Sequence, residues 1–326
     1  MKALVCEAYG PIDNLVVKDI PSPVPGPKQV LIDVKAAAVN FPDALMVQGL
    51  YQVKPPLPFT PGAEIAGIVK AVGAEVKHHK VGDRVIALTS TGGFAEECLA
   101  DMARTMPLPA GMDFDAGAAL VLTYCTSLHA LKDCGHMQPG ETLVVLGAAG
   151  GVGISAIEIG KAMGARVIAA ASSDDKLDLC RKVGADETVN YTTENLKDRI
   201  NELTGGKGAD LVYDPVGGPY TEPAVRALAW RGRLLIIGFA AGEIPKIPLN
   251  LALLKERSLV GVYWGDSTRH DPAGHLANLH QLHEWFAAGT IRPVVSARFP
   301  LAAAKEAIAK IANRQVKGKI VVTPNN

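Results

Sequence analysis

The glycine-rich segment Gly147–Gly153 constrains this chain most, because of what stands on either side of it. It follows the apolar run Thr142–Leu146, which has the length and composition of a buried strand. After the turn, apolar residues recur at helical spacing at Ile154, Ile157 and Ala162. A strand, a glycine turn and a helix in this order are typical of a βαβ unit that binds the pyrophosphate of a dinucleotide.

The spacing of small residues inside the turn supports this interpretation. Ala148, Gly150 and Gly153 fit the fingerprint G-x-G-x-x-G, with alanine in the first place. A glycine-rich turn by itself is also compatible with a plain linker, so the prediction depends on the flanking strand and helix. We predict that the cofactor contacts Ala149, Gly150, Gly151 and Val152.

Length, charge and cysteine content narrow the class of protein. The 326 residues are enough for two domains, and the formal net charge of zero gives no overall attraction to nucleic acid or to an anionic membrane. No apolar run has the length of a membrane helix, and the N-terminal region lacks the apolar core of a signal peptide. Five scattered cysteines without a C-x-x-C pair favour reduced thiols and a cytoplasmic protein.

The pattern of predicted secondary structure changes twice along the chain. Residues 1–118 contain short strand-like runs separated by proline and glycine, which is typical of a compact, partly barrel-like β domain. Residues 119–264 alternate strands with helices, and this predicts a doubly wound parallel sheet of the Rossmann type. Residues 265–326 contain two amphipathic helical stretches and a closing strand from Lys317.

The residues after the second Rossmann strand, predicted at Arg166–Ala171, determine which dinucleotide fits. An acidic residue at the strand end would bind the 2′-hydroxyl of NAD, but Ala171 stands there. Ser172, Ser173 and Lys176 offer hydroxyl donors and a cation to the 2′-phosphate of NADP. The serines are also compatible with a simple helix cap, and a shifted strand end would bring one of the two following acids to the ribose. We predict NADPH on the basis of this register.

Further motifs occur throughout both predicted domains. They are Val39–Asp43 with Gly49–Tyr51, Pro61–Gly67 with Val81–Val85, Leu122–Tyr124, Gly147–Gly153 and Val212–Gly218. Together they resemble the zinc-independent quinone oxidoreductases of the medium-chain dehydrogenase/reductase superfamily, over nearly the whole chain. The resemblance implies a GroES-like, mostly β catalytic domain of residues 1–118 and 265–326, into which the Rossmann domain of residues 119–264 is inserted. It also implies a homodimer formed through the apolar strand 259–264, which we expect at the sheet edge.

The same resemblance bears on metal binding. Zinc-containing members of that superfamily carry a cysteine near the position of Asn40 and a histidine at the position of Ala63, and often four closely spaced cysteines. This chain has neither feature, and tetrahedral zinc needs such nitrogen and sulfur ligands gathered together. His78 and His79 stand in a lysine-rich loop, where solvated residues are more common than ligands. We therefore expect no metal.

Without a Lewis acid, the resemblance implies hydride transfer from NADPH to a quinone. It places Asn40 and Tyr51 beside nicotinamide and substrate, with Asn40 bound to the carbonyl of the acceptor and Tyr51 as a stacking partner or proton donor. Both residues also have a structural explanation, Asn40 as a turn residue and Tyr51 as a loop aromatic. Weaker implied cofactor contacts, for which core packing is the alternative, are Thr123, Thr126, Tyr191, Gly238, Phe239, Ala240, Val262, Trp264 and Lys317.

Two other functions stay open from the sequence. Reduction of an α,β-unsaturated carbonyl or of an enoyl-CoA uses the same hydride geometry as quinone reduction. A protein of another class would bind NADPH without physiological turnover, in a structural or RNA-binding role. Zero net charge and the lack of an arginine-rich aromatic segment argue against nucleic acid.

Overall fold

The computed structural model describes residues 1–325 and divides into two compact units. The first unit comprises residues 1–122 and the segment from Pro293 onward, and the second comprises Thr123–Arg292. The chain therefore leaves the first unit, forms the second and returns to the first.

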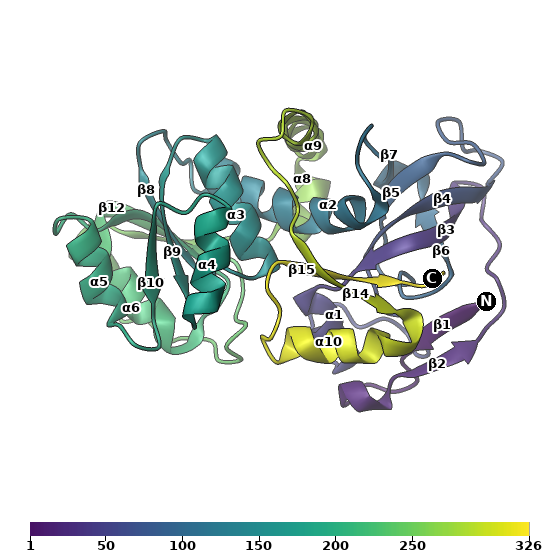
Figure 1. Ribbon diagram of the computed structural model, residues 1–326, viewed down its shortest axis with the longest axis horizontal. Helices are drawn as coiled ribbons and strands as arrows, with labels where there is room; N and C mark the ends of the chain where they lie inside the picture. Colours follow the sequence, from purple (N-terminus) through teal and green to yellow (C-terminus); the bar gives the residue numbers. More distant parts are fainter. Residues whose placement is uncertain (326) are drawn as a thin grey trace. The chain divides into compact units, whose positions relative to one another are not determined.

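The first unit is built on a seven-stranded, mostly antiparallel sheet of order β14-β15-β3-β4-β5-β7, with β6 paired to β3. The strands are β3 (Gln29–Ala38), β4 (Glu64–Val72), β5 (Arg84–Leu88), β6 (Glu97–Asp101), β7 (Thr105–Pro107), β14 (Val295–Pro300) and β15 (Lys319–Thr323). A separate hairpin joins β1 (Lys2–Val5) to β2 (Val16–Asp19). Figure 1 shows the helices α1 (Phe41–Val47) and α10 (Ala304–Ala312) side by side next to β14 and β15.

The second unit contains a six-stranded parallel sheet of order β10-β9-β8-β11-β12-β13, as the alternating pattern predicts. Its strands are β8 (Thr142–Leu146), β9 (Arg166–Ala171), β10 (Glu187–Asn190), β11 (Ala209–Asp214), β12 (Leu228–Ile236) and β13 (Ser258–Gly261). In Figure 1, α3 (Gly151–Ala162) and α4 (Asp174–Lys182) cover one face, and α5 (Leu196–Leu203) and α6 (Thr221–Arg226) cover the other. The strand order reverses between β8 and β11, which is where such sheets bind ligands.

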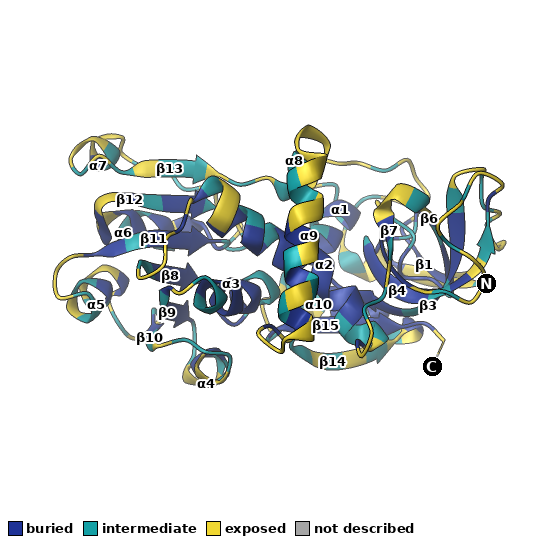
Figure 2. Ribbon diagram, turned by 90° about the horizontal axis from the view of Figure 1, so that it is seen from above, coloured by how far each residue is buried: buried dark blue, intermediate teal, exposed yellow. Residues whose placement is uncertain are grey.

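Two elements of this sheet differ from their predicted bounds. The helix expected up to Trp230 ends at Arg226, because the chain enters β12 already at Leu228. The strand expected at 259–264 ends at Gly261, and Trp264 begins α8 (Trp264–His270). The strand lies at the sheet edge, as predicted. In Figure 2, β13 is coloured as partly exposed, whereas the central strand β8 is coloured as buried.

Residues 265–292 lie in the second unit, whereas we expected them in the first. Side chains of this segment bind other residues of the second unit: Asn278 of α9 (Pro272–Ala287) accepts a hydrogen bond from Lys132 Nζ and donates one to Asp133 Oδ2, both at 2.8 Å. The two partners belong to a π-helical turn, His129–Cys134, that continues α2 (Phe114–Leu128). An amphipathic pattern predicts a helix but contains no information on which unit that helix covers.

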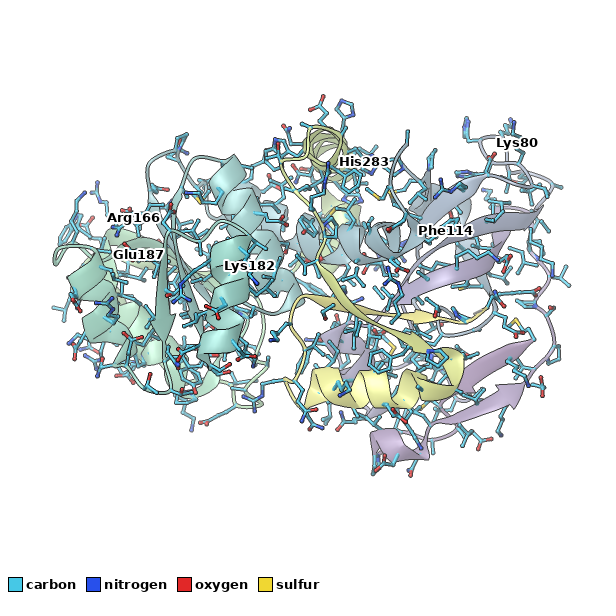
Figure 3. The ribbon with its side chains drawn as sticks, in the orientation of Figure 1. Lys80, Phe114, Arg166, Lys182, Glu187 and His283 are labelled. Atoms are coloured by element: carbon cyan, nitrogen blue, oxygen red, sulfur yellow. The ribbon has the colours of Figure 1, made fainter. Side chains whose placement is uncertain are left out.

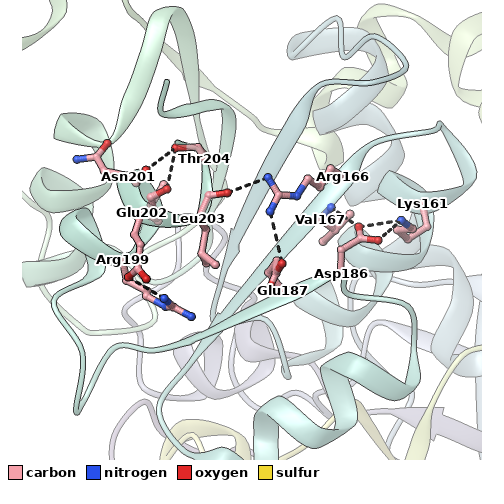
Figure 4. Close-up of polar contacts among 11 residues, drawn as sticks. Lys161, Arg166, Val167, Asp186, Glu187, Arg199, Asn201, Glu202, Leu203 and Thr204 are labelled. Atoms are coloured by element: carbon pink, nitrogen blue, oxygen red, sulfur yellow. Dashed lines mark hydrogen bonds and ion pairs between the residues drawn. The ribbon is translucent and has the colours of Figure 1, made fainter. Parts of the chain in front are cut away.

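Ion pairs hold the amino edge of the parallel sheet (Figures 3 and 4). Arg166 of β9 donates to the carbonyl oxygen of Leu203 at 2.9 Å and lies 3.5 Å from Glu187 of β10. Asp186 accepts hydrogen bonds from Lys161 Nζ at 2.8 Å and from the amide of Val167 at 2.7 Å. Partly exposed pairs of this kind each contribute below about 1 kcal/mol. Their effect is to align the strand starts, and the opposite edge is the one at which a ligand would bind.

No helix among residues 1–325 is both long and apolar enough to cross a membrane.

Candidate functional site

The glycine turn lies between β8 and α3, where the sequence predicts it. Gly147 has a φ of +56°, a conformation that favours glycine, and Gly150 is the N-cap of α3. A Cβ on Gly153 would lie 2.5 Å from the carbonyl oxygens of Gly147 and Ala148, so no side chain fits there. Because Gly150 carries no capping side chain, the turn leaves the helix start open to an anion.

The register of the second strand agrees with the prediction, because β9 ends at Ala171. Lys176 Nζ lies 3.0 Å from Ser172 Oγ, so a cation and a hydroxyl stand together beyond the strand end. Ser173 behaves differently from our expectation, since its hydroxyl donates to the carboxylate of Asp175. Ser172 and Lys176 therefore lie together just beyond the strand end, whereas Ser173 is bound to Asp175.

Several of the remaining predicted cofactor contacts of this unit lie at the carboxyl edge of the parallel sheet. Tyr191 follows β10, and its ring contacts that of Tyr220, with the centroids 4.4 Å apart and the planes tilted by 45°. Gly238, Phe239 and Ala240 follow β12 at the same carboxyl edge, and the Phe239 side chain is 37% exposed. The glycine turn, the Ser172–Lys176 segment, Tyr191 and residues 238–240 thus all follow the carboxyl ends of strands of one sheet.

Four other predicted contacts also lie inside the second unit. Thr123 is buried, and its carbonyl accepts a hydrogen bond from Ser155 Oγ at 3.1 Å, while Thr126 is half-buried on the same helix. The Trp264 ring lies 5.7 Å from the His275 ring, and the Val262 amide donates to the Ile236 carbonyl at 3.0 Å. Packing therefore accounts for a substantial part of their environment.

Asn40 lies in the first unit, 5% exposed, where it begins α1. Its Nδ2 donates to Glu64 Oε2 at 3.2 Å, and its Oδ1 accepts a hydrogen bond from Lys319 Nζ. The second N–H of Nδ2 faces the carbonyl oxygen of Ala38 at 3.4 Å. Both ends of the amide are thus used within the protein, and we expected instead that it would be available to a substrate carbonyl.

A buried charge cluster surrounds Asn40, formed by Asp43, Glu64 and Lys319, with exposures of 1%, 0% and 4%. Lys319 Nζ lies 3.7 Å from Glu64 Oε2 and donates to the carbonyl oxygen of Val39 at 3.2 Å. Glu64 also accepts the amide of Leu122 at 2.8 Å, and Asp43 that of Asn40 at 2.8 Å. We call these four residues, Asn40 included, the Lys319 cluster.

Burial governs the protonation of this cluster. It raises the pKa of Asp43 to about 7 and raises the pKa of Glu64, against the opposing effect of the Lys319 ammonium. It lowers the pKa of Lys319, against the attraction of the two carboxylates. The residues Asp43, Glu64 and Lys319 were not among our predicted site residues. The available signal was a charged residue at the start of each of two otherwise apolar strands, Glu64 in EIAGIV and Lys319 in KIVVT, because such residues are seldom buried unless paired.

Tyr51 and Lys317, also predicted for the site, lie in the first unit. Tyr51 is half-buried and packs against the hydrophobic core of that unit. Lys317 is half-buried and precedes Gly318, which has a φ of +65°. A Cβ on Gly318 would lie 2.5 Å from the carbonyl oxygen of Val294, so glycine is required just before β15.

Two positions at which zinc-containing members of the superfamily carry ligands are occupied here by Asn40 and Ala63. Ala63 has no donor atom, and Asn40 is bound to the Lys319 ammonium, which also repels a divalent cation. His78 is exposed, and His79 Nε2 lies 3.1 Å from the carbonyl oxygen of Thr105. Within residues 1–325, no three His, Cys, Asp or Glu side chains are gathered in a way that would hold a metal ion.

A mostly β unit interrupted by a parallel sheet with a glycine turn is the architecture of dinucleotide-dependent dehydrogenases and reductases. Residues 26–126 match the family described as alcohol dehydrogenase GroES-like domain, and residues 151–281 match the family described as zinc-binding dehydrogenase. The quinone oxidoreductase-like protein 2 homolog of Nematostella vectensis is 38% identical over 325 residues, which cover 98% of this chain and 88% of that protein.

Solved structures agree with the sequence comparison. The structure of Escherichia coli quinone oxidoreductase complexed with NADPH superimposes with a TM-score of 0.92 at 28% identity, covering 99% of this chain and 100% of that one. The CurK enoyl reductase superimposes with a TM-score of 0.89 at 26% identity, covering 99% and 98%. The chain belongs to the medium-chain dehydrogenase/reductase superfamily, as one of its quinone oxidoreductase-like enzymes, which confirms the resemblance found in the sequence.

Proposed function

We propose that this enzyme transfers a hydride from NADPH to a quinone without a metal ion. The observation that carries the cofactor assignment is the contact between Lys176 Nζ and Ser172 Oγ just beyond Ala171, the last residue of β9. A strand that ends without an acid and is followed by a hydroxyl and an ammonium favours a 2′-phosphate over a 2′-hydroxyl. The NADPH-bound structure of the Escherichia coli relative supports the same assignment.

The residues of the second unit fit a dinucleotide. Ala149, Gly150, Gly151 and Val152 would hold the pyrophosphate at the start of α3, where Gly153 leaves no room for a side chain. Ser172 and Lys176 would hold the 2′-phosphate, and Tyr191 with residues 238–240 would flank the dinucleotide. Thr123, Thr126, Val262 and Trp264 are proposed as additional cofactor contacts in this unit, and Lys317, which belongs to the first unit, is proposed as a further one.

The chemistry that the bound cofactor supplies is a hydride, and the chain provides positioning and a proton. A quinone that accepts a hydride becomes a hydroquinone after it also gains one proton, so the site has to admit or hold a proton. Tyr51 offers a planar ring for stacking and a hydroxyl proton. Asn40 is fixed by Lys319 and Glu64, so we propose that it positions the substrate side of the site rather than moving during the reaction.

The second candidate function is reduction of an activated alkene, either an enone or an enoyl-CoA. The specific observation in its favour is the high structural similarity to the CurK enoyl reductase. The same hydride donor and the same positioning residues would serve either acceptor, because both present an electron-poor C=C bond conjugated with a carbonyl group. A protein that binds NADPH without turnover is the third possibility, and the following experiment separates the three.

The test is NADPH oxidation followed at 340 nm with 1,4-benzoquinone, crotonyl-CoA and a simple enone as acceptors, and with NADH in parallel. We expect turnover with the quinone and NADPH. Turnover confined to the thioester or enone would contradict quinone reduction and support alkene reduction. Tight NADPH binding without turnover on any acceptor would contradict both activities. Comparing wild type with Tyr51→Phe shows whether the hydroxyl proton matters, since stacking survives that change.

We also propose a homodimer through the edge strand β13. The strand has one paired neighbour, β12, and exposed apolar side chains nearby in sequence, including Leu253, Leu254 and Tyr263, would be covered by a second copy. We expect a dimer mass at micromolar concentration in sedimentation equilibrium. A Val260→Lys variant places a charge on the edge strand and is expected to give a monomer, and a wild-type monomer would contradict the proposal. A cytoplasmic location and the absence of nucleic-acid or membrane partners stay predictions from composition.

A further inference from the structure

We propose that Asn190 is a specificity-determining residue, which holds the first acidic side chain after β9 away from the adenosine ribose. The inference deepens the NADPH part of the proposed function and rests on it. It concerns a residue on the neighbouring strand β10, outside the segment that would contact the phosphate.

Two acidic residues follow strand β9 closely in the sequence. Asp174 and Asp175 follow the strand end at Ala171 within four residues. A carboxylate near the ribose accepts a hydrogen bond from the 2′-hydroxyl of NAD and repels the 2′-phosphate of NADP. A chain that uses NADPH therefore needs these two carboxylates to be occupied by other donors.

Both carboxylates have such donors in the structure. Asn190 ends β10 directly opposite Ala171 and is 7% exposed, and its Nδ2 donates to Asp174 Oδ1 at 2.9 Å. Because a carboxylate only accepts, this contact sets the orientation of the amide. The Ser173 hydroxyl donates to the second carboxylate, that of Asp175.

The other end of the Asn190 amide is also held. Asn190 Oδ1 lies 2.6 Å from Thr192 Oγ1 and 3.2 Å from the Thr192 amide nitrogen. Thr192 Oγ1 is in turn 3.2 Å from the carbonyl oxygen of Ser172. A buried amide with both ends bound is a rigid support, and it joins the Asp174 carboxylate to the loop that carries Ser172.

Two sets of residues therefore have different roles at the end of β9. Asn190 and Thr192 direct the negative charge of Asp174 towards β10, while Ser172 and Lys176 form the hydroxyl–ammonium pair. Loss of the Asn190 side chain would free the Asp174 carboxylate to turn towards the ribose. The NADPH preference would then fall, although no residue that contacts the phosphate has changed.

The test is a double-mutant cycle of Asn190→Ala, Asp174→Ala and the double variant in the full-length enzyme. The measured quantity is the ratio of kcat/KM for NADPH to kcat/KM for NADH with 1,4-benzoquinone, together with Kd for both dinucleotides. We expect Asn190→Ala to lower the ratio about 5- to 10-fold, as the loss of one partly buried charge-assisted contact would. The double variant should match Asp174→Ala, because Asn190 acts only through that carboxylate.

Two further variants serve as a second test and as a control for the effect of Asn190→Ala on the ratio. Thr192→Val alters an exposed residue and is expected to lower the ratio in the same direction by a smaller factor. Asn195→Ala is the matched control, since it removes an asparagine that caps α5 through the Asp198 amide, and it should leave the ratio unchanged.

The outcomes separate this inference from the proposed function. A wild-type enzyme that prefers NADH would overturn both. A wild-type preference for NADPH that is unchanged in Asn190→Ala and in Thr192→Val would overturn only the role of Asn190. A double variant as impaired as Asn190→Ala would show that the asparagine acts on the fold and not through Asp174, which also contradicts the inference.

Discussion

Replacing Lys319 by methionine is expected to lower the free energy of unfolding of the first unit by about 3–5 kcal/mol. The ammonium is the cation that faces Glu64 at 3.7 Å inside a buried cluster, and Asp43 lies in the same cluster. Without it, two carboxyl groups stay buried with no compensating charge, and Asn40 Oδ1 loses its donor. The measurement is urea denaturation of wild type and variant at the same pH.

The loss of stability in Lys319→Met is expected to depend on pH. The buried carboxyls of the variant can avoid charge only by protonation, so their pKa values in the folded state lie above those in the unfolded chain. A raised carboxyl pKa means that stability falls as pH rises from the unfolded pKa through the folded one. The deficit of Lys319→Met should therefore be larger at pH 8 than at pH 5.

The matched control is Lys310→Met on α10, which removes an exposed ammonium with the same side-chain change. We expect a change within about 0.5 kcal/mol. A Lys319→Met variant as stable as this control, or one equally destabilised at both pH values, would contradict the assignment of Lys319 as the compensating charge of the cluster.

Replacing Lys176 by alanine is expected to reduce kcat/KM for NADPH by about 10- to 100-fold. A hydrogen bond to a charged group contributes about 1.5–3 kcal/mol, and each 1.4 kcal/mol corresponds to a factor of about ten. NADH has no 2′-phosphate, so its kcat/KM should change by less than about threefold. The measurement is steady-state NADPH and NADH oxidation with one quinone acceptor.

Lys182→Ala is the control for this variant. Lys182 is an exposed lysine at the opposite end of α4, labelled in Figure 3, and its removal changes the charge of the helix by the same amount. We expect unchanged kinetics with both dinucleotides. If Lys176→Ala affected NADPH and NADH equally, the lysine would serve the loop structure and not the 2′-phosphate.

Local patterns were sufficient for the dinucleotide half of the protein. The strand Thr142–Leu146, the turn after it and the end of the second strand at Ala171 lie where the sequence predicts them. Each depends on a few consecutive residues, because β-branched runs, glycines and helical spacing are short-range signals. The strand that begins at Ser258 lies at the sheet edge, as expected.

Contacts between distant residues were beyond those patterns. Asn40 was predicted for the site, but its partners Glu64 and Lys319 stand 24 and 279 residues away in sequence. The same holds for residues 265–292, which lie in the second unit, where Asn278 binds Lys132 and Asp133. Neither periodicity nor motif spacing contains information on such pairings.

The sequence by itself therefore determined the class of fold, the glycine turn between β8 and α3 and the end of the second strand at Ala171, on which the prediction of NADPH depends. Those features are local, since φ angles, helix starts and strand ends depend on neighbours along the chain. Only the tertiary structure showed that the Asn40 amide is bound at both ends and that Asp174 is held by Asn190. A buried polar side chain must be satisfied by whatever the fold brings next to it, and that partner is set by sheet order rather than by sequence distance.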